Sequence, residues 1–118
     1  MRKVGAIISV WDGYLCQLRD NKPGIEWPGY WGLFGGHVDR GESDLQAIWR
    51  ELQEELAWVP RKIVKVRECD GIAYFHCRAD NLSSMVQREG RDMDVFPPYN
   101  LPHPMIPFVR QLLAENFQ

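Results

Sequence analysis

The sequence has few cysteines and no excess of charge of either sign. Its three cysteines, Cys16, Cys69 and Cys77, are odd in number and include no C-x-x-C pair. This argues against a disulfide framework or a structural zinc site and for a reducing, cytoplasmic environment, in which all three would be small buried residues. The formal net charge is only −2, so the chain lacks the positive charge that attracts nucleic acid.

Long hydrophobic runs are also missing. The apolar stretch from Val4 to Val10 is short, is interrupted by Gly5 and Ser9, and leads into a turn rather than a cleavage site. It resembles neither a signal peptide nor a membrane span, and we expect no membrane partner. The 118 residues, 45% hydrophobic and 25% charged, predict one globular domain over residues 1–118.

The order of the expected elements predicts an α/β fold with a mixed sheet. Apolar or alternating segments separated by turn residues predict strands over residues 3–10, 14–18, 31–34, 62–67, 72–78 and 91–96. Residues 21–30 hold two prolines and two glycines, which predicts an irregular loop. A final helix is expected to begin at Pro104, with its apolar residues facing inward.

The clearest helix covers residues 43–57. Ser43 and Gln46 have the spacing of a capping box, and Pro60 follows the end of the pattern. Helical spacing gives an apolar stripe that we expect to face the core: Leu45, Ile48, Trp49, Leu52 and Leu56.

Three glutamates, Glu51, Glu54 and Glu55, crowd one face of this helix beside the apolar stripe. Like charges at this spacing repel by about 0.2–0.5 kcal/mol per pair, and the C-terminal half of a helix disfavours negative charge. A hard divalent cation would offset these costs, and magnesium suits phosphate chemistry. The alternative is a solvated acidic face.

The flanking residues favour the metal site. Gly35 and Gly36 are expected to end the third strand, where the backbone can approach a metal or a phosphate because no Cβ intervenes. Glu42 lies in the loop before the helix, and Arg50 lies beside the acidic face. Together these residues resemble the Nudix box, G-x5-E-x7-R-E-U-x-E-E-x-G-U with U a bulky apolar residue, in the segment Gly36-x5-Glu42-x7-Arg50-Glu51-Leu52-x-Glu54-Glu55-x-Ala57-Trp58.

The match has no gap and holds at every charged position. It departs only at Ala57, where the family has glycine; a left-handed alanine there costs about 1 kcal/mol. The resemblance implies a Nudix-like α/β/α sandwich that hydrolyses, with Mg²⁺ or Mn²⁺, a phosphoanhydride bond in a nucleoside diphosphate linked to a group X. It further implies metal ligands at the Gly36 carbonyl, Glu51, Glu54 and Glu55, a general base among these glutamates or on a later loop, and a pair between Glu42 and Arg50.

Outside the box the assignments are less specific. Glu89, in a turn after the helix, would supply a further metal ligand or the general base, or would be a solvated loop residue. Arg19 resembles the phosphate-contacting arginines of the triphosphate-cleaving branch, and His37 directly follows the glycine pair and is placed to contact a phosphate oxygen. Three aromatic residues would stack on a base, or pack beneath the loop: Trp27, Tyr30 and Trp31.

The short chain favours a nucleoside triphosphate pyrophosphohydrolase whose partner is a small nucleotide, active as a monomer or a homodimer. Tyr74, 16 residues after the box, keeps a diadenosine polyphosphate hydrolase as an alternative, and a nucleotide-sugar hydrolase is another. A non-catalytic, nucleotide-sensing domain is the third alternative. Such domains typically lose box carboxylates, whereas all of them are present here.

Overall fold

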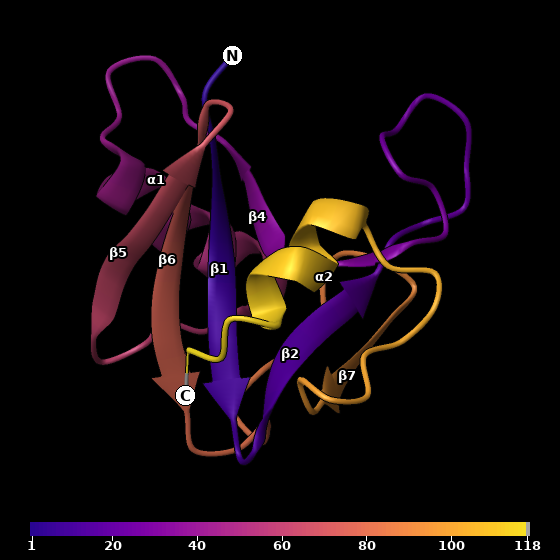
Figure 1. Ribbon diagram of the computed structural model, residues 1–118. Coiled ribbons are helices and arrows are strands. Elements are labelled where there is room, and N and C mark those ends of the chain that lie inside the picture. The colour runs from indigo at the N-terminus through magenta and orange to yellow at the C-terminus, as the bar shows by residue number, and fades with distance from the viewer. Residues whose placement is uncertain (118) are drawn as a thin grey trace.

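One mixed sheet and two helices organise the computed structural model, which describes residues 1–117 (Figure 1). All strands belong to a seven-stranded sheet. In chain order the elements are β1 (Lys3–Val10), β2 (Gly13–Leu18), β3 (Trp31–Gly32), β4 (Phe34–His37), α1 (Asp44–Leu56), β5 (Ile63–Cys69), β6 (Ile72–Ala79), β7 (Asp92–Phe96) and α2 (Pro107–Leu113).

Strand β1 lies at the centre of the sheet. It runs parallel to β6 along its whole length, and on its other edge it pairs antiparallel with β4 near its start and with β2 near its end. Strand β2 continues the sheet to β3 and β7, while β5 pairs with β6 at the opposite edge. The combination of parallel and antiparallel pairs confirms the predicted mixed sheet.

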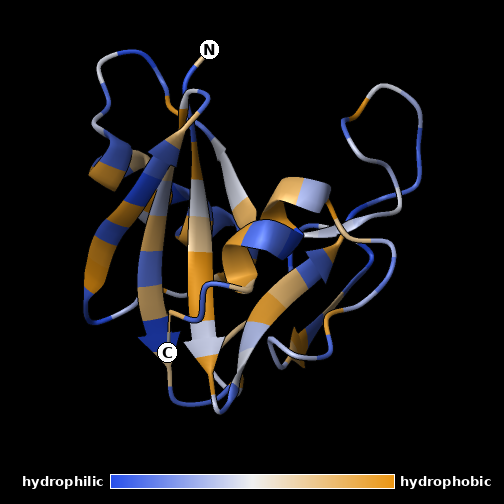
Figure 2. Ribbon diagram, in the orientation of Figure 1, coloured by the Kyte–Doolittle hydropathy of each residue, from blue (hydrophilic) through white to orange (hydrophobic). Residues whose placement is uncertain are grey.

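The two helices cover opposite faces of this sheet. Along β1, Ala6 and Ile8 pack in the core beneath α1, whereas Ile7 packs in the core beneath α2. This alternation follows from the two-residue period of a strand. Figure 2 shows apolar residues concentrated along β1 and β2, and alternation with polar residues along the edge strand β5. The α/β/α sandwich is therefore confirmed.

Helix α1 begins with the predicted capping box. The Gln46 amide donates to Ser43 Oγ at 3.1 Å, and the Ser43 amide donates to Gln46 Oε1 at 2.8 Å. Ala57 adopts the left-handed conformation, with φ 52°, and its amide donates to the Gln53 carbonyl at 3.0 Å. Alanine thus closes the helix in the conformation that the family's glycine would adopt. The apolar stripe was wrong at Leu45, which is 45% exposed and does not belong to the core beneath α1.

Most element ends lie within one or two residues of the sequence prediction, and two regions differ more. The segment expected to be one strand over residues 31–34 forms two short strands, and Gly35 and Gly36 lie inside β4, paired with β1, rather than after it. Helix α2 begins at Pro107 rather than Pro104, because the backbone of residues 104–106 bonds to Trp31 instead. The Trp31 amide donates to the Pro104 carbonyl at 2.9 Å, and the Ile106 amide donates to the Trp31 carbonyl at 3.0 Å.

All three cysteines are free thiols. Cys16 and Cys77 are buried as predicted, whereas Cys69 is only partly buried. Between residues 1 and 117 no helix is both long enough and apolar enough to cross a membrane.

Candidate metal and substrate site

Arg50 connects the loop before α1 to the acidic face of the helix. Its guanidinium binds Glu42 through two nitrogens, at 2.7 and 2.9 Å, and also donates to the His37 carbonyl at 2.9 Å. The bonds to Arg50 hold the pKa of Glu42 below its usual range, and the paired carboxylates raise the pKa of Arg50. The implied Glu42–Arg50 pair is present, and it fixes the loop that follows β4.

The same guanidinium reaches two of the helix glutamates. It donates to Glu51 at 2.8 Å and, more weakly, to Glu54 at 3.3 Å. The Glu51 side chain is 12% exposed, whereas that of Glu54 is 58% exposed. Burial raises the pKa of Glu51, and the bond to Arg50 opposes this shift. Glu51 is thus an enclosed carboxylate, and Glu54 is open to a ligand from solvent.

Gly36 and the Glu51 carboxylate lie in direct contact. A Cβ atom at position 36 would lie 2.6 Å from Glu51 Oε1, so any other side chain there would displace this carboxylate. The missing Cβ therefore leaves room for the Glu51 carboxylate at the backbone of β4.

Glu55 is almost fully buried, at 2% exposure. The Gly35 amide donates to its Oε1 at 2.9 Å. Across residues 1–117, its Oε2 is the buried side-chain oxygen or nitrogen that has no hydrogen-bond partner. Burial raises the pKa of Glu55 to about 10, a hydrogen bond shared with the Glu89 carboxyl and the charges of Glu89 and Glu51 add to the shift, and the bond from the Gly35 amide opposes it.

Glu89 approaches this cluster from the segment between β6 and β7. Its Oε1 accepts from Gln17 Nε2 at 3.4 Å, and its carboxyl contributes to the pKa shifts of both Glu51 and Glu55. Sequence reasoning placed Glu89 among the ligand candidates but missed Gln17. The available signal was a polar residue at a core-facing position, because Gln17 and Leu15 share one face of β2.

These residues fit a hard divalent cation. Carboxylate and carbonyl oxygens are its preferred ligands, and the unsatisfied Oε2 of Glu55 is a buried acceptor that a cation would satisfy. Within the described residues no three acidic, histidine or cysteine side chains already converge as a metal-binding group. Arg50 instead occupies Glu51 and Glu54. A bound cation would thus share these two carboxylates with Arg50.

The loop over residues 20–30 projects from the sheet (Figure 1). Arg19, just before this loop, bonds to two residues in its second half. Its Nε donates to the Glu26 carbonyl at 2.8 Å, and its amide donates to the Tyr30 carbonyl at 2.9 Å. Trp27 has φ 51° and is 42% exposed, and its ring packs edge-on against Tyr30 with centroids 5.1 Å apart. Two of the predicted aromatic residues therefore form one accessible pair.

The other two predicted substrate contacts lie apart from this pair. Trp31 packs edge-on against Phe96, with centroids 4.9 Å apart, next to the core beneath α2. His37 is exposed at the end of β4 and is the smallest contributor to the lowered pKa of Glu26, which is due chiefly to the bond from Lys3. Lys3 pairs with Glu26 at 3.0 Å. The structure thus brings the loop towards the Gly36–His37 end of β4, but gives Trp31 a packing position.

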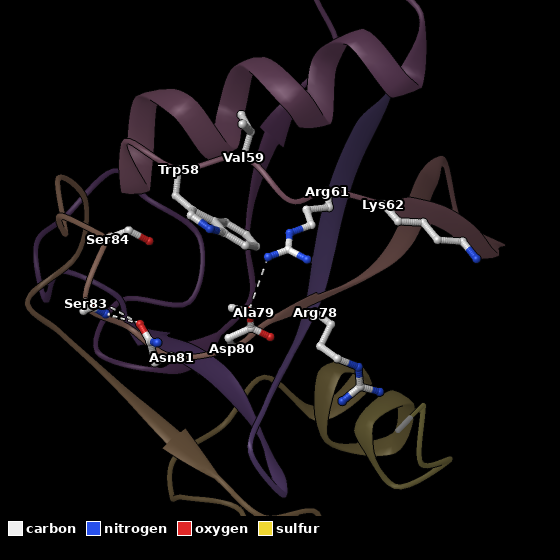
Figure 3. Close-up of a pocket in the computed structure, with 10 residues that line it drawn as sticks. All are labelled: Trp58, Val59, Arg61, Lys62, Arg78, Ala79, Asp80, Asn81, Ser83 and Ser84. Carbon is white, nitrogen blue, oxygen red and sulfur yellow. Dashed lines mark hydrogen bonds and ion pairs between the residues drawn. The ribbon is translucent and has the colours of Figure 1, made fainter.

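A separate cavity of about 470 Å³ lies beyond the C-terminal end of α1 (Figure 3). The Trp58 indole points towards Arg61, which pairs with Asp80 at 3.8 Å, whereas Lys62 and Arg78 point away. Asp80 is the one carboxylate among the ten residues that line it, and none of the α1 glutamates contributes. This cavity is distinct from the acidic site.

The acidic face, the glycine beneath it and the Glu42–Arg50 pair are the features that the Nudix box implies. The family model of the NUDIX domain matches residues 1–106. The chain belongs to the NUDIX domain family.

Two curated relatives are named nucleoside triphosphatase NudI. The protein from Salmonella agona is 49% identical over 47 residues, which are 38% of this chain and 32% of the relative. The protein from Salmonella arizonae is 48% identical over 42 residues, which are 36% of this chain and 28% of the relative. The match spans about a third of the relatives' length.

Solved structures agree on the fold of this NUDIX domain. A MutT NUDIX hydrolase from Burkholderia pseudomallei superposes with a TM-score of 0.76 at 24% identity, over 95% of this chain and 94% of that one. An Ap4A hydrolase from C. elegans superposes with a TM-score of 0.75 at 19% identity, over 97% and 94%. The NUDIX domain of Shewanella oneidensis NrtR, solved with ADP ribose, gives a TM-score of 0.67 at 22% identity, over 98% and 84%.

Proposed function

We propose that this protein is a Mg²⁺-dependent hydrolase of a phosphoanhydride bond in nucleoside diphosphates linked to X, with nucleoside triphosphates as the preferred substrates. One observation carries the proposal. Glu55 buries a carboxylate oxygen with no partner beside Glu51 and Glu89. Burying an ionised carboxylate in this way is costly unless a cation compensates it or the group takes up a proton, and a cation bound here would replace that proton.

The proposed metal ligands are the Gly36 carbonyl, Glu51, Glu54, Glu55 and Glu89. Bound Mg²⁺ would neutralise charge on the phosphates and lower the pKa of the attacking water. Glu54 is the most exposed glutamate of α1 in this set, and its one ion pair within residues 1–117 is with Arg50 at 3.3 Å, so its carboxylate is accessible to accept the proton of that water. Arg50 and Glu42 would hold the loop and the glutamates in register.

The preference for triphosphates rests on the NudI relatives, which are named nucleoside triphosphatases. We propose that Arg19 and His37 contact the phosphates, and that the Trp27–Tyr30 pair stacks on the base. Trp31 is the weakest member of the predicted substrate set, since it already packs against Phe96.

The alternatives have less support. Tyr74 is 5% exposed and its ring packs against Phe108 beneath α2, with centroids 5.7 Å apart, so it gives no support to a diadenosine polyphosphate site. A sensing role remains the second candidate because the NrtR NUDIX domain was solved with ADP ribose. Retention of every box carboxylate favours turnover instead.

Phosphate and pyrophosphate release from a panel of nucleoside triphosphates, nucleotide sugars and dinucleoside polyphosphates tests the proposal. With Mg²⁺ we expect release from at least one triphosphate, and complete loss in EDTA. Glu54→Gln should lower kcat at least about 100-fold while the fold survives. Glu68→Gln is the matched control, because Glu68 lies on β5 and is, like Glu54, a glutamate paired with basic side chains, here Arg2 and Lys65. Undiminished turnover in excess EDTA would contradict the proposal, and nucleotide binding without turnover would favour sensing.

A further inference from the structure

Gln17 is a polar residue in the core beneath α1. It is 1% exposed and lies on β2, two residues after the fully buried Leu15. Its Nε2 donates to the Leu33 carbonyl at 3.1 Å and to Glu89 Oε1 at 3.4 Å. A single buried amide thus joins β2, the residue before β4 and the segment that carries Glu89.

The segment around Glu89 is docked by its backbone. The Val86 amide donates to the Leu56 carbonyl at 2.9 Å, the Arg88 amide donates to the Glu55 carbonyl at 2.8 Å, and the Arg91 amide donates to the Leu18 carbonyl at 2.8 Å. These bonds fix the main chain on either side of Glu89 but leave its side chain exposed. In the described residues, the amide of Gln17 donates to its carboxylate, which also shares a hydrogen bond with the carboxyl of Glu55.

The turn after Glu89 closes tightly on Gln17. Gly90 has φ 81°, a conformation that favours glycine. A Cβ at this position would lie 2.6 Å from Gln17 Oε1 and 2.8 Å from the Leu18 carbonyl oxygen. Glycine therefore allows the Glu89 turn to approach the buried amide.

We propose that Gln17 is a positioning residue, which holds the Glu89 carboxylate against the α1 glutamates and so completes the oxygen ligands offered to the metal. The inference rests on the proposed function for its catalytic consequence, although metal binding tests it directly. The competing interpretation is structural: Gln17 would satisfy the Leu33 carbonyl, and its contact with Glu89 would have no effect on the metal.

Titration with Mn²⁺, followed by the electron paramagnetic resonance of the free ion, separates these interpretations without a nucleotide. Gln17→Met keeps the length of the side chain and removes its donor. We expect it to weaken Mn²⁺ binding about 10- to 100-fold, the usual effect of losing a group that orients a metal ligand. Cys16→Ala is the matched control, since Cys16 is a buried β2 residue that faces the core beneath α2. It should leave Mn²⁺ affinity within about twofold of wild type.

A double-mutant cycle shows whether Gln17 acts through Glu89. In a Glu89→Ala background, Gln17→Met should change Mn²⁺ affinity by less than about twofold, because the carboxylate that it positions is absent. If the two substitutions weaken Mn²⁺ binding independently, so that their fold-losses of affinity multiply in the double variant, the inference is overturned. An unchanged Mn²⁺ affinity in Gln17→Met would also overturn it.

Melting curves show which variant to use. If Gln17→Met does not fold, Gln17→Asn keeps a polar amide but withdraws it from Glu89 by one methylene, and the same loss of Mn²⁺ affinity is expected. Wild-type affinity in a folded Gln17→Asn protein would then overturn the inference. If the wild-type protein binds Mn²⁺ but hydrolyses nothing in the nucleotide panel, the proposed function fails and the role of Gln17 is still decided by the cycle.

Discussion

The carboxylate of Glu51 occupies the space that a side chain at position 36 would fill. A Cβ built on Gly36 would lie 2.6 Å from Glu51 Oε1 and 2.7 Å from Oε2. The obstacle is the flexible end of a side chain, so a substitution at position 36 would move the carboxylate rather than the backbone. This contact ties the glycine of the box to the placement of one proposed metal ligand.

Gly36→Ala should therefore impair metal binding without unfolding the protein. The new methyl group would displace the Glu51 carboxylate, and this should weaken Mn²⁺ binding about 10- to 100-fold. The melting temperature without metal should fall by no more than about 5 °C. Isothermal titration with Mn²⁺ and thermal melts in EDTA measure the two quantities.

Gly5→Ala provides the control for this prediction. A Cβ at position 5 would meet the Tyr74 ring at 3.1 Å, beneath α2, so it perturbs β1 without touching a glutamate. Its effect should appear in the melting temperature and not in Mn²⁺ affinity. Equal metal affinity in Gly36→Ala and wild type would show that Glu51 does not need its present position to bind the ion.

Local sequence signals predicted much of the fold and most of the acidic site. The capping box and the helical period define α1, and the i, i+3 and i+4 spacing places Glu51, Glu54 and Glu55 together because helix geometry is local. Local signals failed where long-range pairing decides the structure. The backbone of residues 104–106 bonds to Trp31, which delays α2 until Pro107.

The contact between Gln17 and Glu89 shows the same limit within the site. These residues are 72 positions apart, and no local pattern specifies that their segments meet. The alternation along β2 indicates only that Gln17 faces the core with Leu15. Likewise, Trp31 was grouped with the loop aromatics by its position in sequence, whereas β-pairing directs its ring towards Phe96.

Arg50→Lys should loosen the loop before α1 although the positive charge is kept. An ammonium group lacks the planar fork with which Arg50 binds Glu42 through two nitrogens while also reaching Glu51 and the His37 carbonyl. We expect a fall in melting temperature of about 5 °C. Arg67→Lys is the comparison, because Arg67 pairs with Glu115 on the surface, where such pairs contribute little. A larger effect at Arg67 would contradict the prediction.

His76 should make the protein less stable in mild acid. Burial, with a smaller contribution from the charge of Arg78, lowers the pKa of His76 below its usual 6.5, while Ser9 Oγ lies 2.8 Å from its Nε2. As pH falls through 6.5 the unfolded chain gains a proton before the folded protein does, so folding stability decreases until the folded-state pKa is passed. Urea unfolding at pH 7.5 and 5.5 should show this decrease.

The control for this pH effect is His76→Gln, which keeps hydrogen-bonding groups but does not titrate. The variant should lose less stability than wild type between pH 7.5 and 5.5, and the difference should not depend on magnesium because His76 lies on β6, away from the acidic site. Identical losses in the two proteins would assign the acid sensitivity to other groups.

Trp27→Ala should raise KM for the best nucleotide and leave metal binding unchanged. The exposed Trp27 ring packs edge-on against Tyr30 and is held near the Gly36–His37 end of β4 by the Lys3–Glu26 pair, so it can reach a base while the phosphates lie at the glutamates. Stacking on a base contributes roughly 1–3 kcal/mol, which corresponds to about a 10- to 100-fold rise in KM.

Trp11→Ala is the control, since Trp11 is also exposed but lies at the β1–β2 turn. If KM and the ranking of nucleotides are the same in Trp27→Ala as in wild type, the base is recognised elsewhere, and residues 88–99, which comprise β7 and the loop residues on either side of it, become the segment to mutate.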